Sequence, residues 1–297
     1  MKKENPIFLN SVSELHSFLN IKKPTHPLVS VIKLDDLGCM LADDVQLVYN
    51  FYTVNLKKNF DGKIKYGQQY YDFDDGTMTF FAPKQSLSIE ANSAQKAEGW
   101  MLIFHPEFLQ SYPLAKRIKE YGFFSYAANE ALHLSDQEEV LIYGIMQNLQ
   151  QEIERMIDNF TQDLVISHID LLLNYCNRFY NRQFITRKRV SSDLLVKFEE
   201  YLQNYPQDEK PTVTYFAEKL SISPHYLNDM LKNSTGQTTQ QHIQNKLIEK
   251  AKELLSTTTL SVSEIAYQLG FEYPQSFNKL FKNKIEMSPL EYRQSFN

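Results

Sequence analysis

Short runs of β-branched and aromatic residues, separated by turn residues, occupy the first hundred positions of the chain. These runs predict strands over residues 28–32, 46–54, 63–66, 78–81 and 99–104. The dipeptides Asp61-Gly62 and Asp75-Gly76 lie between them and are typical of hairpin turns. Ahead of the strands, Ser11 and Glu14 have the spacing of a capping box, which predicts a short opening helix. Several strands at near-regular spacing indicate a small barrel or sandwich.

From about residue 107 to 182, apolar residues recur at steps of three and four, which is the period of a helix. A capping box at Ser135 and Glu138 precedes one apolar stripe, made of Ile142, Ile145, Leu149, Ile153, Met156, Phe160 and Leu164. Asp158-Asn159 interrupts the stripe and predicts a hairpin of two helices. The stripe has two interpretations, packing against the strand domain or a homodimer seam, and the pattern leaves both open.

The C-terminal hundred residues contain an internal repeat. Residues 216–224 are echoed by residues 265–274, and the two alanines, Ala217 and Ala266, are 49 positions apart. Each copy predicts two short helices at a sharp angle, with a small alanine where the helices approach closely. Ser221 or Gly270 lies in the turn, and a proline then occupies the first position of the second helix.

The second helix of each copy has one apolar face and one polar face. The apolar positions predicted to point inward are Leu227, Met230, Leu231, Phe277, Leu280 and Phe281. The polar positions predicted to point outward are His225, Asn228, Asp229, Lys232, Gln275, Ser276, Asn278, Lys279 and Lys282. A helix over residues 240–256 joins the copies and is expected to hold them at a fixed separation.

These motifs resemble the AraC/XylS family of bacterial transcription regulators over about 100 residues. The first half of the family signature is similar to residues 231–236 and 251–255, and the second half to residues 262–271, 276–277, 281–282 and 287–293. The chain departs from the family pattern at three positions. Lys246 stands where many members have Arg, His242 replaces a usual Tyr, and Glu286 replaces a usual Gly before Ser288-Pro289.

The resemblance implies that each copy inserts its second helix into the major groove of double-stranded promoter DNA. Carried over by position, the base-reading residues are His225, Asn228, Asp229, Gln275, Ser276 and Lys279, with Asn278 on the same outward face. Amide, carboxylate and ammonium groups at such positions suit adenine, cytosine and guanine edges. Lys232 and Lys282, one turn further along, are implied phosphate contacts. A homodimer, and RNA polymerase if the protein is an activator, are the further implied partners.

The N-terminal strands resemble the cupin-like effector barrel that many family members carry. Residues 80–85 and 99–106 bear this looser likeness, which implies a small-molecule effector. Strand alternation makes Tyr49, Phe51, Tyr66, Phe80 and Trp100 candidates for an effector pocket, although aromatic residues in small barrels are usually core. The seven histidines lack the His-x-His spacing of metal cupins, so neither a metal nor another cofactor is expected.

The expected fold class is α+β multidomain, and the chain is not expected to be an enzyme. Residues 1–182 would form a cupin-like β-barrel with a helical dimerisation hairpin, residues 183–192 a linker, and residues 193–297 an all-α tandem helix-turn-helix domain. A regulator with an empty barrel has the same pattern. The alternative from another class is a cupin-type enzyme with an appended helical domain, which would need a metal triad. A helical interaction adaptor is disfavoured by the polar outward positions.

Charge changes this picture only when it is divided along the chain. The 297 residues carry 31 basic and 36 acidic side chains, for a net charge of −5, which by itself argues against DNA binding. However, residues 178–189 hold five basic and no acidic side chains, and residues 274–284 hold three lysines and no acid.

The start of the chain lacks a signal-peptide pattern, two cysteines are too few for a disulfide framework, and no apolar run reaches membrane-spanning length. A cytoplasmic location, with no membrane partner and only modest salt dependence of DNA binding, is therefore expected.

Overall fold

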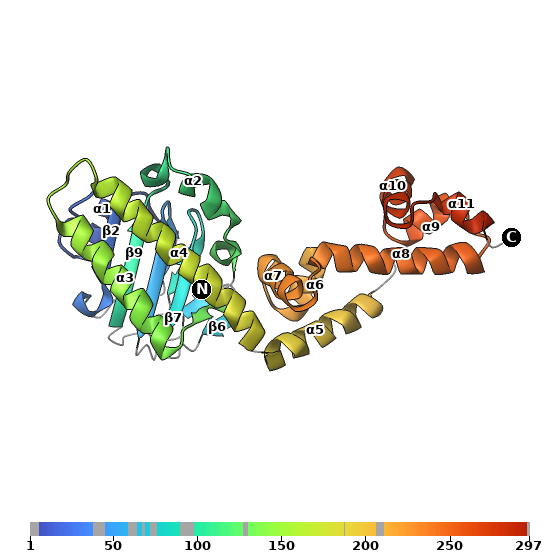
Figure 1. The fold of residues 1–297 in the computed structure, drawn as a ribbon, viewed down its shortest axis with the longest axis horizontal. Helices are drawn as coiled ribbons and strands as arrows, with labels where there is room; N and C mark the ends of the chain where they lie inside the picture. The colour runs from blue at the N-terminus through green and yellow to red at the C-terminus, as the bar shows by residue number, and fades with distance from the viewer. Residues whose placement is uncertain are drawn as a thin grey trace. The chain divides into compact units, whose positions relative to one another are not determined.

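The computed structural model describes residues 6–37, 45–58, 64–66, 69–71, 76–89, 98–126, 130–186, 188–205 and 211–295. The chain divides into two compact units, Met1–Gln183 and Phe184–Asn297 (Figure 1). The first unit contains all of the described strands, and the regular elements among the described residues of the second are helices.

The N-terminal unit has two sheets, each of five described strands. The first sheet has the order β1-β3-β8-β5-β6 and the second has the order β10-β7-β4-β9-β2. The strands are β1 (Ile7–Leu9), β2 (Val29–Lys33), β3 (Val45–Tyr49), β4 (Tyr52–Lys58), β5 (Ile64–Tyr66), β6 (Gln69–Tyr71), β7 (Thr77–Phe81), β8 (Ser86–Ile89), β9 (Glu98–Phe104) and β10 (Leu132–His133). β1 pairs with β3 in parallel, whereas the other described pairs are antiparallel.

Side-chain caps define where the helices of this unit begin. Its α-helices are α1 (Val12–Phe18), α2 (Leu114–Arg117), α3 (Asp136–Glu154) and α4 (Thr161–Thr186), with 3-10 turns η1 (Leu34–Asp36), η2 (Pro106–Leu109), η3 (Ile118–Glu120) and η4 (Gly122–Ser125). The Ser11 hydroxyl accepts a hydrogen bond from the Glu14 amide, and a capping box at Ser135 starts α3. Asp158 accepts from the amides of Phe160 and Thr161 and so starts α4. The opening helix and the break of the hairpin at Asp158 are both confirmed.

The side chains of strand β4 alternate between the two faces of its sheet, and each face packs against a different partner. Thr53 pairs with Phe81 of β7 and with Ile103 of β9, and these two residues belong to the cluster between the sheets. The opposite face of this sheet is covered by α3 and α4 (Figure 1). There, Met78 of β7 touches the Cys176 thiol of α4.

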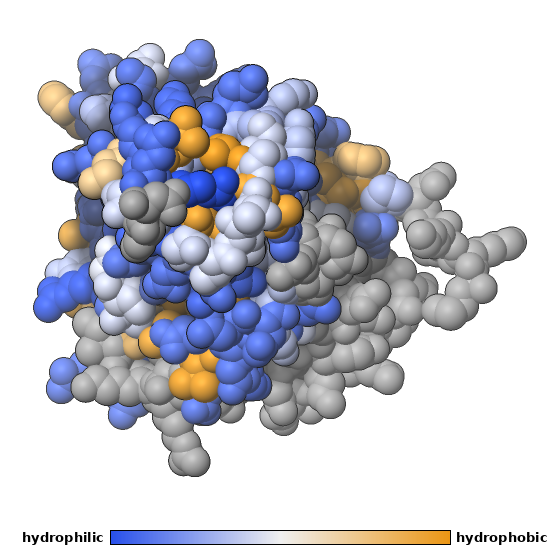
Figure 2. Space-filling model, turned by 90° about the vertical axis from the view of Figure 1, so that its right-hand side faces the viewer, coloured by the Kyte–Doolittle hydropathy of each residue, from blue (hydrophilic) through white to orange (hydrophobic). Residues whose placement is uncertain are grey.

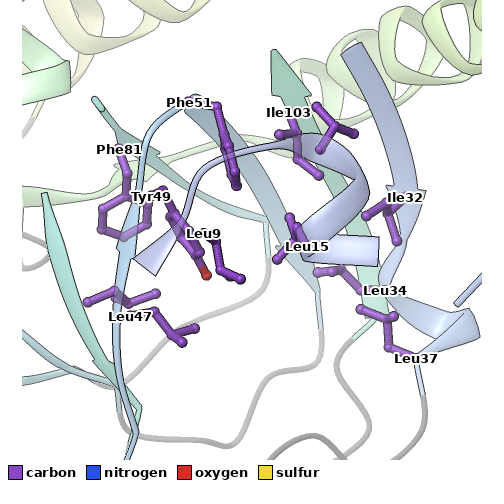
Figure 3. Packing of buried hydrophobic residues seen from close by; sticks show 12 residues of the cluster. Leu9, Leu15, Ile32, Leu34, Leu37, Leu47, Tyr49, Phe51, Phe81 and Ile103 are labelled. Atoms are coloured by element: carbon purple, nitrogen blue, oxygen red, sulfur yellow. The ribbon is translucent and has the colours of Figure 1, made fainter. Parts of the chain in front are cut away.

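A hydrophobic cluster joins the two sheets to α1. In Figure 3, side chains from β1, α1, β2, β3 and β9 point toward a common centre. Val12, Phe51 and Ile103 are fully buried in this cluster, and Leu47 and Leu15 are almost as inaccessible. Removal of this apolar surface from water is the main term that stabilises the sandwich.

The predicted apolar stripe is buried only in part. Ile142 and Leu149 of α3 are fully buried, and Ile145 and Ile153 are largely buried, which supports packing against the strand domain. Met156, Phe160 and Leu164 are exposed instead. The α3 part of the stripe is therefore not available to a second copy, and a homodimer seam would have to use other surfaces.

Two expectations for the N-terminal unit need correction. The predicted strand 46–54 is two strands, because Asn50 and Phe51 form a corner from which β3 enters one sheet and β4 enters the other. The predicted cupin-like barrel is not confirmed, since the described residues form two sheets and do not close into a barrel. Cys39 and the Asp61-Gly62 turn lie outside the described residues.

The C-terminal unit consists of helices arranged around one long central helix. They are α5 (Lys188–Gln203), α6 (Val213–Leu220), α7 (Pro224–Thr235), α8 (Thr239–Thr257), α9 (Val262–Gln268), α10 (Pro274–Ile285) and α11 (Pro289–Gln294). The predicted linker, 183–192, is helical where it is described, because α4 extends to Thr186 and α5 begins at Lys188.

Candidate nucleic-acid interface

Two helix corners, α6–α7 and α9–α10, form the repeat. Each corner turns through a residue in the left-handed conformation, Ser221 (φ 57°) in the first copy and Gly270 (φ 81°) in the second. Ser223 caps α7 by accepting from the Tyr226 amide, and Pro224 occupies its first turn. Pro274 has the same place in α10. The repeat seen in the sequence is thus a repeat of structure.

The inward face of each second helix is buried as predicted, with one exception. Leu227, Met230 and Leu231 of α7 are fully buried, and so are Phe277 and Phe281 of α10. The paired alanines of α6 and α9 are also fully buried, which fits their place at the close approach of two helices. The exception is Leu280, which is only half-buried.

Helix α8 connects the two corners and contacts both. A capping box at Thr238 starts it, and its buried face includes Ile243 and Ala251. The Lys284 ammonium of α10 donates to Asn245 Oδ1 of α8 over 2.9 Å. The Arg293 guanidinium of α11 donates to the Leu255 carbonyl over 3.1 Å. These contacts hold the second corner against α8, and the sequence pattern gave no signal for them.

All of the predicted DNA-facing residues of the second copy are exposed. They lie on α10 and are Gln275, Ser276, Asn278, Lys279 and Lys282. The first turn of α10 has no acidic residue, and its last turn carries Lys282 and Lys284. An exposed helix face with amide, hydroxyl and ammonium donors has the chemistry that base edges and phosphates require.

The first copy differs, because two of its four candidates are held inside the unit. His225 and Lys232 are exposed, whereas Asn228 and Asp229 are half-buried. Asn228 Oδ1 accepts from the Thr239 amide at the start of α8 over 3.4 Å, and its Nδ2 donates to Asp229 Oδ1 over 3.4 Å. Asn228 therefore links α7 to α8. The sequence could not reveal this role, because it depends on a contact between two helices.

The turn that ends each second helix is the same in both copies despite the unusual glutamate. Gly236 ends α7 with φ 76°, and Glu286 ends α10 with φ 65°. Each residue donates its amide to the carbonyl four positions earlier, from Lys232 or from Lys282. The geometry of this turn, which the glutamate put in question, is preserved.

The other two departures from the family pattern lie on α8. The His242 ring packs edge-on against Phe198 of α5, and its Nε2 lies 2.8 Å from the Thr235 hydroxyl of α7. Desolvation lowers the pKa of His242, and the nearby Glu199 carboxylate partly opposes this shift. The Lys246 ammonium lies 3.4 Å from the Glu249 carboxylate.

The described effector candidates are buried in three different places. Tyr49 and Phe51 stack on each other within the cluster between the sheets. Phe80 packs on the other face of its sheet, against Phe123 of η4 and Tyr180 of α4, and Trp100 packs against Tyr143 of α3. Tyr66 lies in β5, but its side chain is outside the described residues. The structure therefore does not bring Phe80 and Trp100 together with Tyr49 and Phe51.

Lys57 was missed as a titratable group of the strand domain. It lies near the end of β4, where burial lowers the pKa of its ammonium group to about 7. The sequence signal that could have identified Lys57 is the presence of a lysine inside a predicted strand.

The described residues offer neither a metal site nor a membrane span. No group of three or more histidine, cysteine or carboxylate side chains in them could hold a metal ion. No helix in this part of the chain is long and apolar enough to cross a membrane.

Polar side chains cover most of the face shown in Figure 2, and hydrophobic ones gather in small separate patches. Exposed apolar residues of the C-terminal unit include Tyr267, Tyr273 and Leu290. Scattered residues of this kind are normal on a protein surface.

Comparison with known proteins assigns the C-terminal helices. Residues 216–295 match the family model described as a helix-turn-helix domain. The chain is 31% identical over 144 residues to the uncharacterized HTH-type transcriptional regulator YfiF of Bacillus subtilis, which is 48% of this chain and 44% of that protein. It is 37% identical over 78 residues to the HTH-type transcriptional activator RhaS of Escherichia coli, which is 26% of this chain and 28% of that protein.

Among solved structures, the chain is similar to the C-terminal domain of the two-component response regulator yesN from Fusobacterium nucleatum. The identity is 35%, the match covers 34% of this chain and 98% of that one, and the TM-score is 0.33. This chain spans less than half of the length of the curated relatives that it matches. Residues 216–295 are a helix-turn-helix domain.

Proposed function

We propose that this protein is a sequence-specific transcription regulator of the AraC/XylS type that binds promoter DNA through both helix corners. One observation carries the proposal. The chain contains two structurally equivalent corners, α6–α7 and α9–α10, and both pack on α8. At 1.5 Å per residue, the 19 residues of α8 span about 28 Å. Successive major grooves on one face of the duplex are about 34 Å apart, so the connector has the length that two-groove binding needs.

The two reading helices contribute differently in this proposal. The five exposed polar residues of α10 would read bases and contact phosphate, as described above for the second copy. In α7, His225 would read bases and Lys232 would contact phosphate, since both are exposed. Asn228 and Asp229 would need to break their contacts with each other and with α8 to reach a base. We therefore expect α10 to supply most of the sequence specificity.

Selection of bound duplexes from a random library tests the proposal. The full chain is expected to enrich two short motifs whose centres lie about one helical turn apart. The affinity for the enriched duplex should fall with increasing salt, because lysine contacts release counterions from DNA. Absence of any enriched motif at low salt would contradict the proposal.

The regulator would act as a homodimer in the cytoplasm, under control of a small-molecule effector bound by the N-terminal unit. Helix α3 and most of helix α4, which make up the predicted dimerisation region 135–182, support the dimer. They expose apolar side chains at Val140, Leu164 and Leu171. A second copy covering these side chains would bury them from water. RNA polymerase would be a partner if the protein activates transcription.

A further inference from the structure

The residue that precedes α10 differs in kind from those that precede the neighbouring helices. α6, α7, α8, α9 and α11 each follow a serine or threonine whose hydroxyl accepts a hydrogen bond from a backbone amide of the first turn. These capping residues are Thr212, Ser223, Thr238, Ser261 and Ser288. α10 follows Tyr273 instead, and the Tyr273 side chain forms no capping hydrogen bond. Helix stability alone would favour serine, threonine, aspartate or asparagine at this position.

The Tyr273 side chain is exposed and takes no part in the packing of the unit. It is 60% exposed. No hydrogen bond or ring contact joins it to another described residue. Its backbone is nevertheless restricted, because Pro274 follows and favours the extended conformation that Tyr273 adopts, with φ −129° and ψ 124°. The fold therefore fixes the place of this side chain without using it for packing or capping.

Tyr273 lies beside residues that the proposed function directs at DNA. Gln275 and Ser276, in the first turn of α10, are exposed polar residues. In helix-turn-helix proteins, residues at the N-terminal end of the second helix contact base edges. The first copy has Ser223 at the equivalent place, where its hydroxyl accepts from the Tyr226 amide over 3.2 Å. The two copies thus differ here, with a capping serine in one and an exposed tyrosine in the other.

An exposed aromatic ring suits one group of the major groove in particular. Base edges in this groove present hydrogen-bond donors and acceptors, and the C5-methyl group of thymine is their apolar feature. Packing of a ring against this methyl group removes apolar surface of both partners from water. Tyrosine also loses little conformational entropy on binding, because its side chain has only two torsion angles.

We propose that Tyr273 is a specificity-determining residue whose ring packs against the methyl group of a thymine in the half-site that α10 reads. The ring, rather than the hydroxyl, distinguishes thymine from the other bases. This inference rests on the DNA binding proposed above, and it adds an apolar contact to the polar ones of Gln275 and Lys279. It assigns a thymine preference to the second copy that the capping Ser223 does not give to the first.

Thermal unfolding of the full chain separates a structural role of Tyr273 from a contact with DNA. Tyr273→Ser is expected to raise the melting temperature by about 4 °C, because the serine supplies the missing cap. Ser223→Ala removes the equivalent cap of α7 and should lower the melting temperature by a similar amount. A lower melting temperature for Tyr273→Ser would overturn the inference, since the tyrosine would then serve the fold.

Uracil substitution in the selected duplex measures the contact itself. Each thymine is replaced singly by deoxyuridine, which removes only the C5-methyl group. At one position the wild-type chain is expected to lose affinity about fourfold, which corresponds to the burial of one methylene-sized group. Tyr273→Phe keeps the ring and should show the same loss, whereas Tyr273→Ser should bind the thymine and uracil duplexes equally well. Tyr201→Ser is the matched control, because Tyr201 is an exposed tyrosine of α5 outside both corners, and it should behave as wild type.

The outcomes distinguish this inference from the proposed function. A selected duplex without thymine, no loss at any position, or an equal loss in the wild-type chain and in Tyr273→Ser would overturn the inference and leave DNA binding intact. A loss that disappears in Tyr273→Phe would also overturn it, because the hydroxyl would then make the contact. Failure of the full chain to select any duplex would refute the proposed function, and this inference with it.

Discussion

Replacing Glu286 with glycine is expected to stabilise the C-terminal helices. Glu286 follows the last residue of α10 and holds the left-handed conformation, with φ 65° and ψ 4°. Side chains with a Cβ crowd the following carbonyl in this conformation, whereas glycine does not. The equivalent position in the first copy is already a glycine, Gly236, with φ 76°. The substitution Glu286→Gly therefore gives the second copy the residue that the first copy already has at this position.

The size of the effect follows from opposing terms. Relief of the left-handed conformation contributes about 1–2 kcal/mol. The greater freedom of glycine in the unfolded chain offsets about 0.5–1 kcal/mol of this. Removing a carboxylate from the negative end of the α10 dipole adds about 0.3 kcal/mol or more. The net stabilisation is about 1 kcal/mol, which corresponds to a rise in melting temperature of about 4 °C for a unit of this size.

Thermal unfolding of the full chain, followed by circular dichroism, measures the shift. Gly236→Ala is the control, because no atom lies within 4 Å of the added Cβ and the substitution changes the backbone preference alone. It should lower the stability by about 1 kcal/mol. If Glu286→Gly lowers the melting temperature while Gly236→Ala behaves as expected, the left-handed turn after α10 does not limit stability and the reasoning is refuted.

Four further predictions concern the DNA-binding and dimer surfaces. Asn228→Ala should lower the free energy of unfolding by about 0.5–1.5 kcal/mol, because the Thr239 amide loses its acceptor. The control Asn278→Ala, at an exposed position, should change it by less than about 0.5 kcal/mol. Equal effects of the two substitutions in urea unfolding would contradict the link from α7 to α8. Lys282→Ala should weaken binding to all duplexes and reduce the salt slope by about one, and a changed base preference in fluorescence anisotropy would refute its phosphate contact. Gln275→Ala should relax the preference at one base pair by about 1–3 kcal/mol, and uniform weakening across all positions of the selected duplex would argue against direct readout. Leu171→Asp should convert dimer to monomer in light scattering, and an unchanged mass would exclude this face of α4 from the dimer seam.

The C-terminal domain was predictable from the sequence because its signals are local. Caps, turn residues and the spacing of apolar positions each depend on a few neighbouring residues. The repeat at Ala217 and Ala266 shows the same signals twice. The features that were missed depend on distant contacts. Asn228 has the same place in its copy as the exposed Asn278, and only the start of α8 distinguishes the two environments.

In the N-terminal unit, the strands were predicted better than their arrangement. Residues 46–54 look like one strand, but the chain turns at Asn50 and Phe51 and enters a second sheet. Alternation along a strand shows which side chains share a face, but it does not say whether that face meets a helix or the other sheet. Phe80 and Trp100 were therefore expected beside a pocket and instead contact η4, α4 and α3. Short strands such as β1 and β6, with three residues each, gave no clear periodic signal.

The spacing of the two half-sites tests the central claim most directly. Affinity of the full chain is measured for its selected duplex and for a duplex in which about five base pairs, half a helical turn, are inserted between the motifs. The insertion places the second motif on the opposite face of the DNA. Because α8 holds the two corners in one unit, the second corner does not reach that face while the first corner is bound. The account predicts that affinity falls to that of a duplex with one motif. Equal affinity for both duplexes would contradict simultaneous binding by the two corners.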